Sequence, residues 1–585
     1  MIGGLGSGIA AIIAGCGGDG GDGEDPTDPN DGEASVIYRA PHGNYEEQLN
    51  YNPWNPQTHS TNMTQAPFGF YDDLQQQWVS EFLGGPIADA NPTRGESVEF
   101  QLTDGMQWMN GDEYVAEDLV LHFELLREAI GEETGPWIHS DRVYAEDDET
   151  LVFDLTTEAA WGIISTDFWE AGGITPATPR DVFQEDFEAH QDASSDSAKQ
   201  EATNTLFEKQ IGLPDGPPNG WTAWEPVSAE SQYVVNELRE DHPWADDFDF
   251  ERVYGVNLNL MKEQGLEMIQ SGDLHVLREP LSESDIGRFE QGDEYRVDTK
   301  FETQCTALLI NHDHDMLGRP EFRRALAYMI DIPQAAQLLF PPEPAAEPFP
   351  SPIQQNHIEE FLGDTRDQML TYETDRERGE EILRDIGLSK QGGEWIRPDG
   401  ESLDIEFISP PAALLDKGSS IISNQLNSLG ITHDLVDKPG SYMWSQGYPE
   451  AGYDLVVGPW KSGIHPVQSM LIVYLEDNAH PPLINMPEEF SYPSEIGNLD
   501  SEEKTINVRE TILKMPNMPD GEMNDWIKEL TWAYNSQVVS LGISQKRFHN
   551  VWRVDEWEIP PLDTTGMGAE QVAKHLPKRG NLAQK

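Results

Sequence analysis

Side chains able to do acid–base or nucleophilic chemistry are abundant in this sequence, but they follow no catalytic pattern. The chain carries 106 Asp and Glu residues, so pairs of neighbouring carboxylates are expected by chance. The sequence contains no H-E-x-x-H, no G-x-S-x-G and no phosphate-binding loop. We therefore predict that the protein is not an enzyme, has no catalytic residue and uses no cofactor.

One short run could bind a metal. His312 and His314 alternate with Asp313 and Asp315, and imidazole and carboxylate groups at this density are suitable ligands for a transition metal. In a protein this rich in Asp, a solvated loop between a strand and a helix is the simpler interpretation. We therefore predict no metal site.

The remaining candidates are aromatic and amide side chains, which bind small solutes without covalent chemistry. Trp460 comes directly after an apolar run, Tyr453–Gly458, that is typical of a strand, and ligands of α/β proteins bind at the carboxyl ends of strands. Trp54 lies in an N-P-W run rich in turn residues, and each tryptophan is equally compatible with an ordinary core or rim position. The predicted ligand-binding residues are Trp54, Asn55, Gln57, Asn62, Gln65, Trp221, Trp444 and Trp460.

Charge restricts the classes of partner. The 585 residues include 37 Lys and Arg against 106 Asp and Glu, a net charge of −69. This balance argues against a nucleic-acid partner and against docking on anionic lipid, because both need clustered cations. The 16 Trp, 17 Tyr and 21 Phe argue against disorder. We interpret the acidic excess as the surface of a halophilic, haloarchaeal-like protein, since molar salt screens such repulsion within about 3 Å.

The N-terminal segment predicts export and anchoring. Residues 1–15 are small and apolar, too short to span a membrane but suited to a signal peptide. The run Ile13-Ala14-Gly15-Cys16 resembles the lipobox of exported lipoproteins, in which Cys16 is the lipid attachment site, although no basic segment precedes it. Residues 17–34 are acidic and rich in Gly and Pro, as in a flexible tether. Cys305 has no obvious disulfide partner.

Three stretches predict an α/β fold. Phe100–Phe123 has the pattern of a strand, two turns and an amphipathic helix. In Leu308–Asp331 a strand precedes a helix that begins at Pro320, and Asp331 is placed to cap a second helix. From residue 395, the sequence predicts a hairpin around Asp399-Gly400 that ends at Phe407. A helix over 415–429 and strands over 431–436 and 453–457 follow, in the order of a parallel βαβ unit.

The first two stretches also resemble a known family. LTDGMQWMNGDEYVAEDLVLHF is similar to the "LRDGVxFHDGxPxTAEDVxxSF" signature of the family 5 extracellular solute-binding proteins of ABC importers, of the oligopeptide-, dipeptide- and nickel-binding type. LLINHDHDMLGRPEFRRALAYMID is similar to the "gfNtxxpPfxDxrvRqAlxyaiDr" pattern of the same family. Further similarity extends over nearly all residues after 35.

The resemblance implies the periplasmic-binding-protein type II (cluster C) fold, with two lobes and an additional subdomain in the first. The expected division is a signal segment 1–16, a tether 17–34, lobe I from 35–305 plus 539–585 with the subdomain at about 50–215, and lobe II from 306–538. The expected function is capture of an oligopeptide or similar small solute and its delivery to the permease subunits. We expect a lipid-anchored, extracytoplasmic monomer.

The cargo is left open by the sequence. In peptide-binding relatives an aspartate lies about three residues beyond the tryptophan equivalent to Trp460 and pairs with the peptide amine, but this chain has Gly463 there. A buried ammonium without its partner costs several kcal/mol. An oligosaccharide is therefore the alternative ligand, and a secreted hydrolase is a remote alternative function.

Overall fold

The computed structural model describes the following residues: 35–40, 69–72, 77–80, 83–86, 97–102, 105–130, 140–155, 180–209, 211, 220, 222–229, 233–257, 262–279, 281–339, 345–346, 348–410, 413–438, 442–443, 447, 452–460, 470, 484–515, 518–560 and 583–585. The predicted signal segment and tether, at 1–16 and 17–34, lie outside these ranges.

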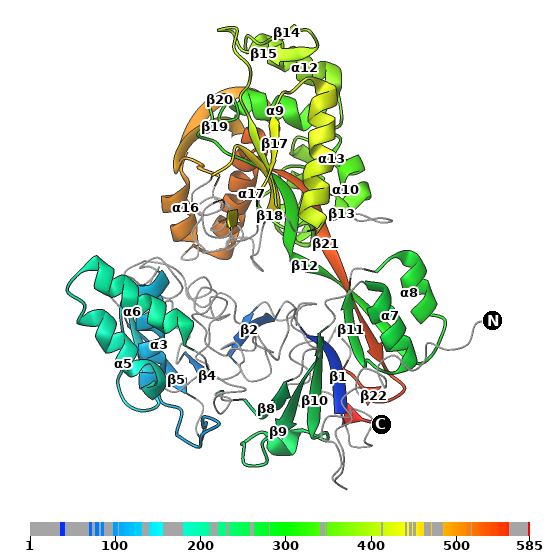
Figure 1. Cartoon of the computed structure of the whole chain (residues 1–585). Helices are drawn as coiled ribbons and strands as arrows, with labels where there is room; N and C mark the ends of the chain where they lie inside the picture. Colours follow the sequence, from blue (N-terminus) through cyan, green and yellow to red (C-terminus); the bar gives the residue numbers. More distant parts are fainter. Residues whose placement is uncertain are drawn as a thin grey trace.

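Eleven of the described strands form one mixed sheet that extends through both parts of the molecule (Figure 1). Its order is β17-β16-β18-β12-β21-β11-β1-β10-β9-β8, and β13 pairs with β21 outside this path. The strands are β1 Ser35–Ala40, β8 Trp224–Ala229, β9 Tyr233–Leu238, β10 Arg252–Asn257, β11 Val276–Glu279, β12 Tyr295–Ile310, β13 Ala345–Ala346, β16 Glu406–Ser409, β17 Asp434–Asp437, β18 Leu455–Trp460 and β21 Leu541–Arg553.

The long strands β12 and β21 connect the two parts of the sheet. They pair antiparallel from Tyr295 opposite Arg553 to Leu308 opposite Leu541. In the upper part of Figure 1, β12 also pairs with β18, whereas in the lower part β21 pairs with β11. The register shifts between Phe301 and Cys305, so the pairing is irregular where the strands pass from one part to the other.

The lower part also contains a second, four-stranded sheet of order β4-β5-β7-β6 and several helices. These strands are β4 Leu83–Pro86, β5 Ser97–Leu102, β6 Ser140–Ala145 and β7 Thr150–Leu155. The helices are α3 Ala116–Ile130, α5 Asp181–Gln191, α6 Asp196–Glu208, α7 Lys262–Ser271 and α8 Glu283–Phe289, with a short η3 at Ala245–Asp247. Two small two-stranded sheets pair β2 Gly69–Asp72 with β3 Gln77–Ser80 and β22 Trp557–Glu558 with β23 Ala583–Gln584.

The Phe100–Phe123 stretch is held together by a buried carboxylate. Asp118, in the first turn of α3, accepts hydrogen bonds from the Trp108 indole (2.9 Å), from the Val115 N–H (3.1 Å) and from the Arg180 N–H (3.0 Å). The buried Arg239 guanidinium binds the carbonyl of Trp108 at 3.2 Å. Each of these residues thus has a structural role, and the stretch joins the four-stranded sheet to the main one.

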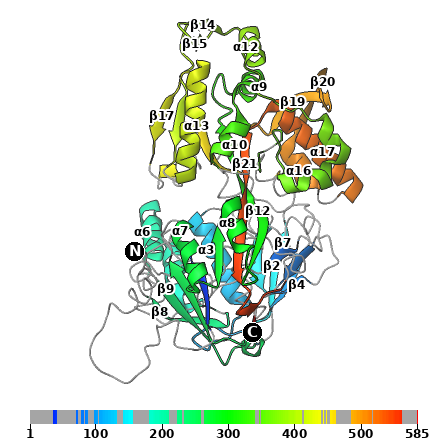
Figure 2. The ribbon, with the colours of Figure 1, turned by 90° about the vertical axis from the view of Figure 1, so that its right-hand side faces the viewer.

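The upper part packs helices and hairpins on both faces of the main sheet. The helices are α9 Pro320–Met329, α10 Ile332–Leu339, α11 Ile358–Leu362, α12 Arg376–Asp385, α13 Ala413–Leu429, α16 Val508–Lys514 and α17 Asp520–Gln537, with η4 Gln355–His357 and η5 Gly363–Gln368. The hairpins pair β14 Ser389–Gln391 with β15 Glu394–Ile396 and β19 Glu489–Glu495 with β20 Asn498–Asn507. Figure 2 shows α13 and α17 on opposite sides of β21.

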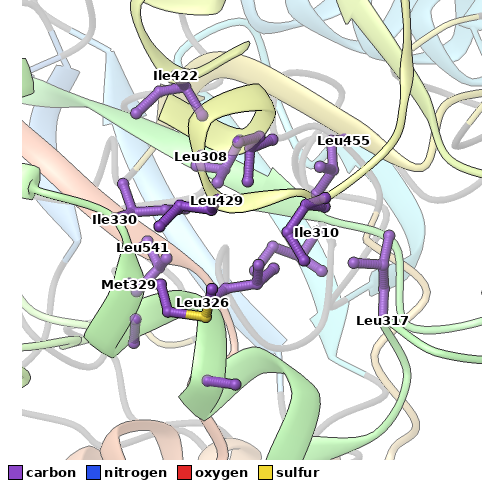
Figure 3. Packing of buried hydrophobic residues seen from close by; sticks show 14 of the residues in the cluster. Leu308, Ile310, Leu317, Leu326, Met329, Ile330, Ile422, Leu429, Leu455 and Leu541 are labelled. Atoms are coloured by element: carbon purple, nitrogen blue, oxygen red, sulfur yellow. The ribbon is translucent and has the colours of Figure 1, made fainter. Parts of the chain in front are cut away.

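Two apolar cores lie on the two faces of this sheet, because successive strand residues point to opposite faces. Ala307 and Leu309 of β12 belong to the core beneath α17. Leu308 and Ile310 belong to the core formed with α9, α10 and α13, which Figure 3 shows. This second core also includes Leu326, Met329, Ile330, Ile422, Leu429, Leu455 and Leu541.

Most local predictions are confirmed. Pro320 begins α9, and Asp331 accepts the N–H of Gln334 at 2.9 Å as a helix cap. β16, α13 and β17 form the predicted parallel unit.

The predicted hairpin over 395–407 is wrong. β15 pairs instead with the preceding β14, across a two-glycine turn in which Gly392 has φ +65° and Gly393 has φ +103°. Such turns favour the hairpin geometry most strongly. Asp399-Gly400 does form a turn, closed by the Gly400 N–H and the Arg397 carbonyl at 2.9 Å, but β16 beyond it pairs with β17 and β18.

The predicted lobe boundaries remain predictions. The boundary at 305/306 falls inside β12, and the boundary at 538/539 falls just before β21. Both positions lie on the two strands that pass between the upper and lower parts in Figure 1.

A buried arginine fixes the end of α17. The Arg323 side chain is 1% exposed, and its Nε donates to the carbonyls of Gln537 and Val538, both at 3.0 Å. Its Nη1 donates to the carbonyl of Leu317 at 2.8 Å. Burial, followed by repulsion from Arg324, lowers the pKa of Arg323 to about 9, which leaves it charged at neutral pH. A cation here faces the negative end of the helix dipole.

We predict that Arg323→Met lowers the free energy of unfolding by about 3–5 kcal/mol, because three buried carbonyls lose their donor. Denaturant unfolding in molar KCl measures the change. Arg378→Met is the control: Arg378 is half exposed and pairs with Glu381 at 3.4 Å, so about 0.5 kcal/mol or less is expected. Equal midpoints for the two variants would contradict this role of Arg323.

Candidate solute-binding site

Trp460 is the last residue of β18, and it lies in the layer of the sheet nearest the passage between the two parts. It pairs with Cys305 of β12, and its side chain is 3% exposed. Its indole N–H donates to the Tyr534 hydroxyl at 2.9 Å. The strand thus continues beyond the predicted end at residue 457 and includes the tryptophan. The hydrogen bond from its indole N–H to Tyr534 connects the edge of the ring to α17.

The neighbouring positions in the same layer are amide side chains. Gln545 of β21 lies opposite Cys305. Its Oε1 accepts the Gln355 N–H at 2.9 Å, and its Nε2 donates to Gln354 Oε1 at 3.3 Å. We call Trp460, Cys305, Gln545, Gln354 and Gln355 the crossing layer.

Two buried oxygen atoms in and beside the crossing layer have no hydrogen-bond partner among the described residues. They are Oε1 of Gln355, in the layer, and Oγ1 of Thr306, the next residue along β12. Thr306 is 1% exposed. Buried polar atoms normally have hydrogen-bond partners. These two oxygen atoms therefore keep a hydrogen-bonding capacity that the described residues do not use.

The crossing layer can stack and hydrogen-bond, and its one thiol, that of Cys305, is buried. The hydrogen bonds described above join indole, amide and hydroxyl groups. Neutral groups of this kind provide orientation and specificity in small-molecule sites. The arrangement therefore suits reversible binding of an uncharged portion of a solute.

The other predicted ligand residues cannot be placed beside Trp460. They lie outside the described residues, as does the lipid attachment residue: Trp54, Asn55, Gln57, Asn62, Gln65, Trp221, Trp444 and Cys16. Their proposed roles remain predictions.

Sequence reasoning missed the amides of the layer. Gln354 and Gln355 lie in a Ser-Pro-Ile-Gln-Gln run between predicted elements, and Gln545 lies two residues beyond Ile543, the last residue of an apolar run. A polar pair directly after an apolar run was the available signal. No local signal indicated that these residues meet, because the strand register brings them together.

The two histidines of the 311–315 run form hydrogen bonds with the protein backbone. His312 Nε2 lies 2.9 Å from the Val539 carbonyl, and His314 Nδ1 accepts the N–H groups of Met316 and Leu317, both at 3.2 Å. Within the part of the chain that the structure describes, no group of three or more metal ligands occurs. Burial, and secondarily the charge of Arg323, lowers the pKa of His312 well below its ordinary value.

A hollow of about 1000 Å³ lies at the opposite end of β12 and β21, lined by residues that include Tyr295, Arg296 and Trp557. The Arg296 guanidinium donates to the carbonyls of Ile559 (2.9 Å) and Pro560 (3.0 Å). Its cation is thus bound to the protein's own backbone. Tyr295 is at the far end of β12 from Cys305, so this hollow is separate from the crossing layer.

Comparison with known proteins decides the family. Residues 91–480 match the family model described as "Bacterial extracellular solute-binding proteins, family 5 Middle". The chain belongs to this family. It is a non-catalytic receptor, the substrate-binding protein of an ABC importer for peptides or related solutes. Among curated protein sequences, none matches it.

Solved structures of low sequence identity share its α/β fold. The oligopeptide-binding protein AppA from Bacillus subtilis, in complex with a nonapeptide, is 12% identical with a TM-score of 0.65; 94% of this chain and 99% of that one are covered. A periplasmic oligopeptide-binding protein from Thermotoga maritima, bound to mannohexaose, has 15% identity, TM-score 0.67 and the same coverage. NikZ from Campylobacter jejuni with Ni(L-His) has 15% identity and TM-score 0.62, also over 94% and 99%.

In the described part of this receptor, no helix has the length and apolar character needed to cross a membrane.

We predict that stability falls as the pH is lowered from about 7 to 5.5, partly through His312. Its folded-state pKa is lowered, so the unfolded state takes up a proton first as the pH falls through about 6.5. The stability that neutral His312 contributes is fully present above that pH. Below it, the free energy of unfolding falls with a slope that approaches about 1.4 kcal/mol per pH unit. Denaturant midpoints across this range should be flatter for His312→Gln; identical slopes would contradict the assignment.

Proposed function

We propose that this receptor captures an oligopeptide or a similar small solute between the upper and lower parts and presents it to the importer's permease. The observation that supports this most directly is the position of Trp460, at the end of β18 and beside the passage of β12 and β21. A solute bound at that level contacts both parts. It therefore favours a closed arrangement over an open one, and the permease recognises the closed form.

We propose further that recognition depends on stacking and neutral hydrogen bonds. The crossing layer offers an indole ring and amide groups, and Gln355 and Thr306 retain unused buried oxygens. Gly463 stands where the resemblance to peptide-binding members leads us to expect a carboxylate. A peptide would accordingly be held by its main chain and side chains, since a buried ammonium without a partner is costly.

An oligosaccharide is the second candidate. Sugar rings stack on tryptophan faces, and their hydroxyl groups pair with amide side chains. Trp460 and the glutamines of the crossing layer have this character. The Thermotoga maritima structure bound to mannohexaose provides a precedent within the same fold.

We also propose that the receptor is a monomer anchored on the extracytoplasmic face through a lipid on Cys16, with residues 17–34 as tether. The support is the Ile13-Ala14-Gly15-Cys16 sequence. In a host membrane fraction, mass spectrometry should find an acylated N-terminal cysteine, and Cys16→Ser should release the protein into the medium. A membrane-bound Cys16→Ser protein would contradict this proposal.

Calorimetry in molar KCl tests the ligand proposal. The probes are a set of oligopeptides, the same peptides N-acetylated, and mannohexaose. We expect binding of at least one probe, with acetylated and free peptides agreeing within about twofold, since no carboxylate holds the amine. Strong preference for the free amine would overturn the recognition mode.

Trp460→Ala should weaken the best probe by at least about tenfold, the effect of losing one stacking ring. Trp526→Ala is the control. Trp526 is a partly buried residue of α17, and its loss should leave the affinity for the probe unchanged. Equal affinity of the wild type and Trp460→Ala, with folding intact, would place the ligand elsewhere.

A further inference from the structure

The indole N–H of Trp460 is engaged within the protein. It donates to the Tyr534 hydroxyl at 2.9 Å, and that hydroxyl is also hydrogen-bonded to the Ser540 hydroxyl. All three side chains are buried, with 3%, 1% and 0% exposure respectively. Because the Tyr534 oxygen accepts from the indole, its own proton is available to Ser540. The three groups form a chain from β18 through α17 to the residue before β21.

Tyr534 is itself held in place by its neighbours. It lies in the last turn of α17, where the carbonyl groups that follow are bound by side chains of the α9 region. Arg324 donates to the Ser536 carbonyl at 3.2 Å, and Arg323 donates to the carbonyls of Gln537 and Val538, both at 3.0 Å. The acceptor for the indole is therefore attached to a fixed helix end and not to a loop.

We propose that Tyr534 is a positioning residue for solute binding: it fixes the plane of the Trp460 ring without contacting the solute. This inference rests on the proposed function, in which Trp460 contacts the ligand. With its N–H engaged, Trp460 offers the ligand only a ring face. The favoured partner is then a flat or C–H-rich surface, such as a sugar ring or the apolar face of a peptide side chain, and not a hydrogen-bond acceptor.

Tyr534→Phe tests the proposal because it removes the hydroxyl oxygen and leaves the ring. Tyr372→Phe is the matched control, since it makes the same change in a half-buried tyrosine whose hydroxyl contacts the same helix end. Calorimetry with N-acetylated oligopeptides and mannohexaose should show about five- to tenfold weaker binding for Tyr534→Phe, the effect of one hydrogen bond. Binding by Tyr372→Phe should stay within about twofold of the wild type.

A second readout needs no ligand. In protein labelled with 5-fluorotryptophan, the fluorine resonance of Trp460 is assigned by its absence in Trp460→Phe. We expect this resonance to shift or broaden in Tyr534→Phe and to remain in place in Tyr372→Phe. The resonance of Trp532, on the same helix and bonded to the Pro493 carbonyl at 2.7 Å, should be unchanged in both variants.

The outcomes separate the two proposals. If Trp460→Ala binds the probes as well as the wild type, the proposed site is wrong, whatever Tyr534→Phe does. If Trp460→Ala loses binding while Tyr534→Phe retains it, the site stands and the positioning role is wrong. An unchanged Trp460 fluorine resonance in Tyr534→Phe also overturns the positioning role.

Discussion

The docking of the C-terminal end of α17 on α9 determines the geometry of the crossing layer. Arg323 and Arg324 bind the carbonyl groups of residues 536–538, and Val538 ends the helix in the left-handed conformation with φ +48°. β21 begins three residues later, at Leu541. The position of Gln545 opposite Cys305 therefore follows from this helix end, and so does the position of Tyr534 beside Trp460.

Cations are scarce in this chain, which has 37 Lys and Arg residues and a net charge of −69. Among the described residues, two arginines are nevertheless buried at joints, the places where secondary-structure elements meet. Arg323 and Arg239 both donate to backbone carbonyl groups. Carbonyl oxygens stay neutral at every pH and are shielded here from solvent ions. These joints consequently depend less on salt than surface ion pairs do, and they suit a protein whose surface we interpret as halophilic.

Local features of the fold could be predicted from sequence because their signals are local. Pro320 marks the start of α9 through its own backbone preference, and Asp331 caps the next helix with its own side chain. The predicted hairpin at Asp399-Gly400 is wrong because β15 pairs with β14, which precedes it across the Gly392-Gly393 turn, and not with β16. Trp460 could be proposed from the sequence because it follows a predicted strand. Gln354, Gln355 and Gln545 could not, since only the long-range register of β12 and β21 brings them together.

We propose that a solute is captured between the two parts that β12 and β21 connect. Small-angle X-ray scattering in molar KCl tests it most directly, with the best calorimetric probe added at saturation. We expect a smaller radius of gyration with ligand than without, because closure brings the two parts together. An unchanged radius at full saturation would contradict capture by closure.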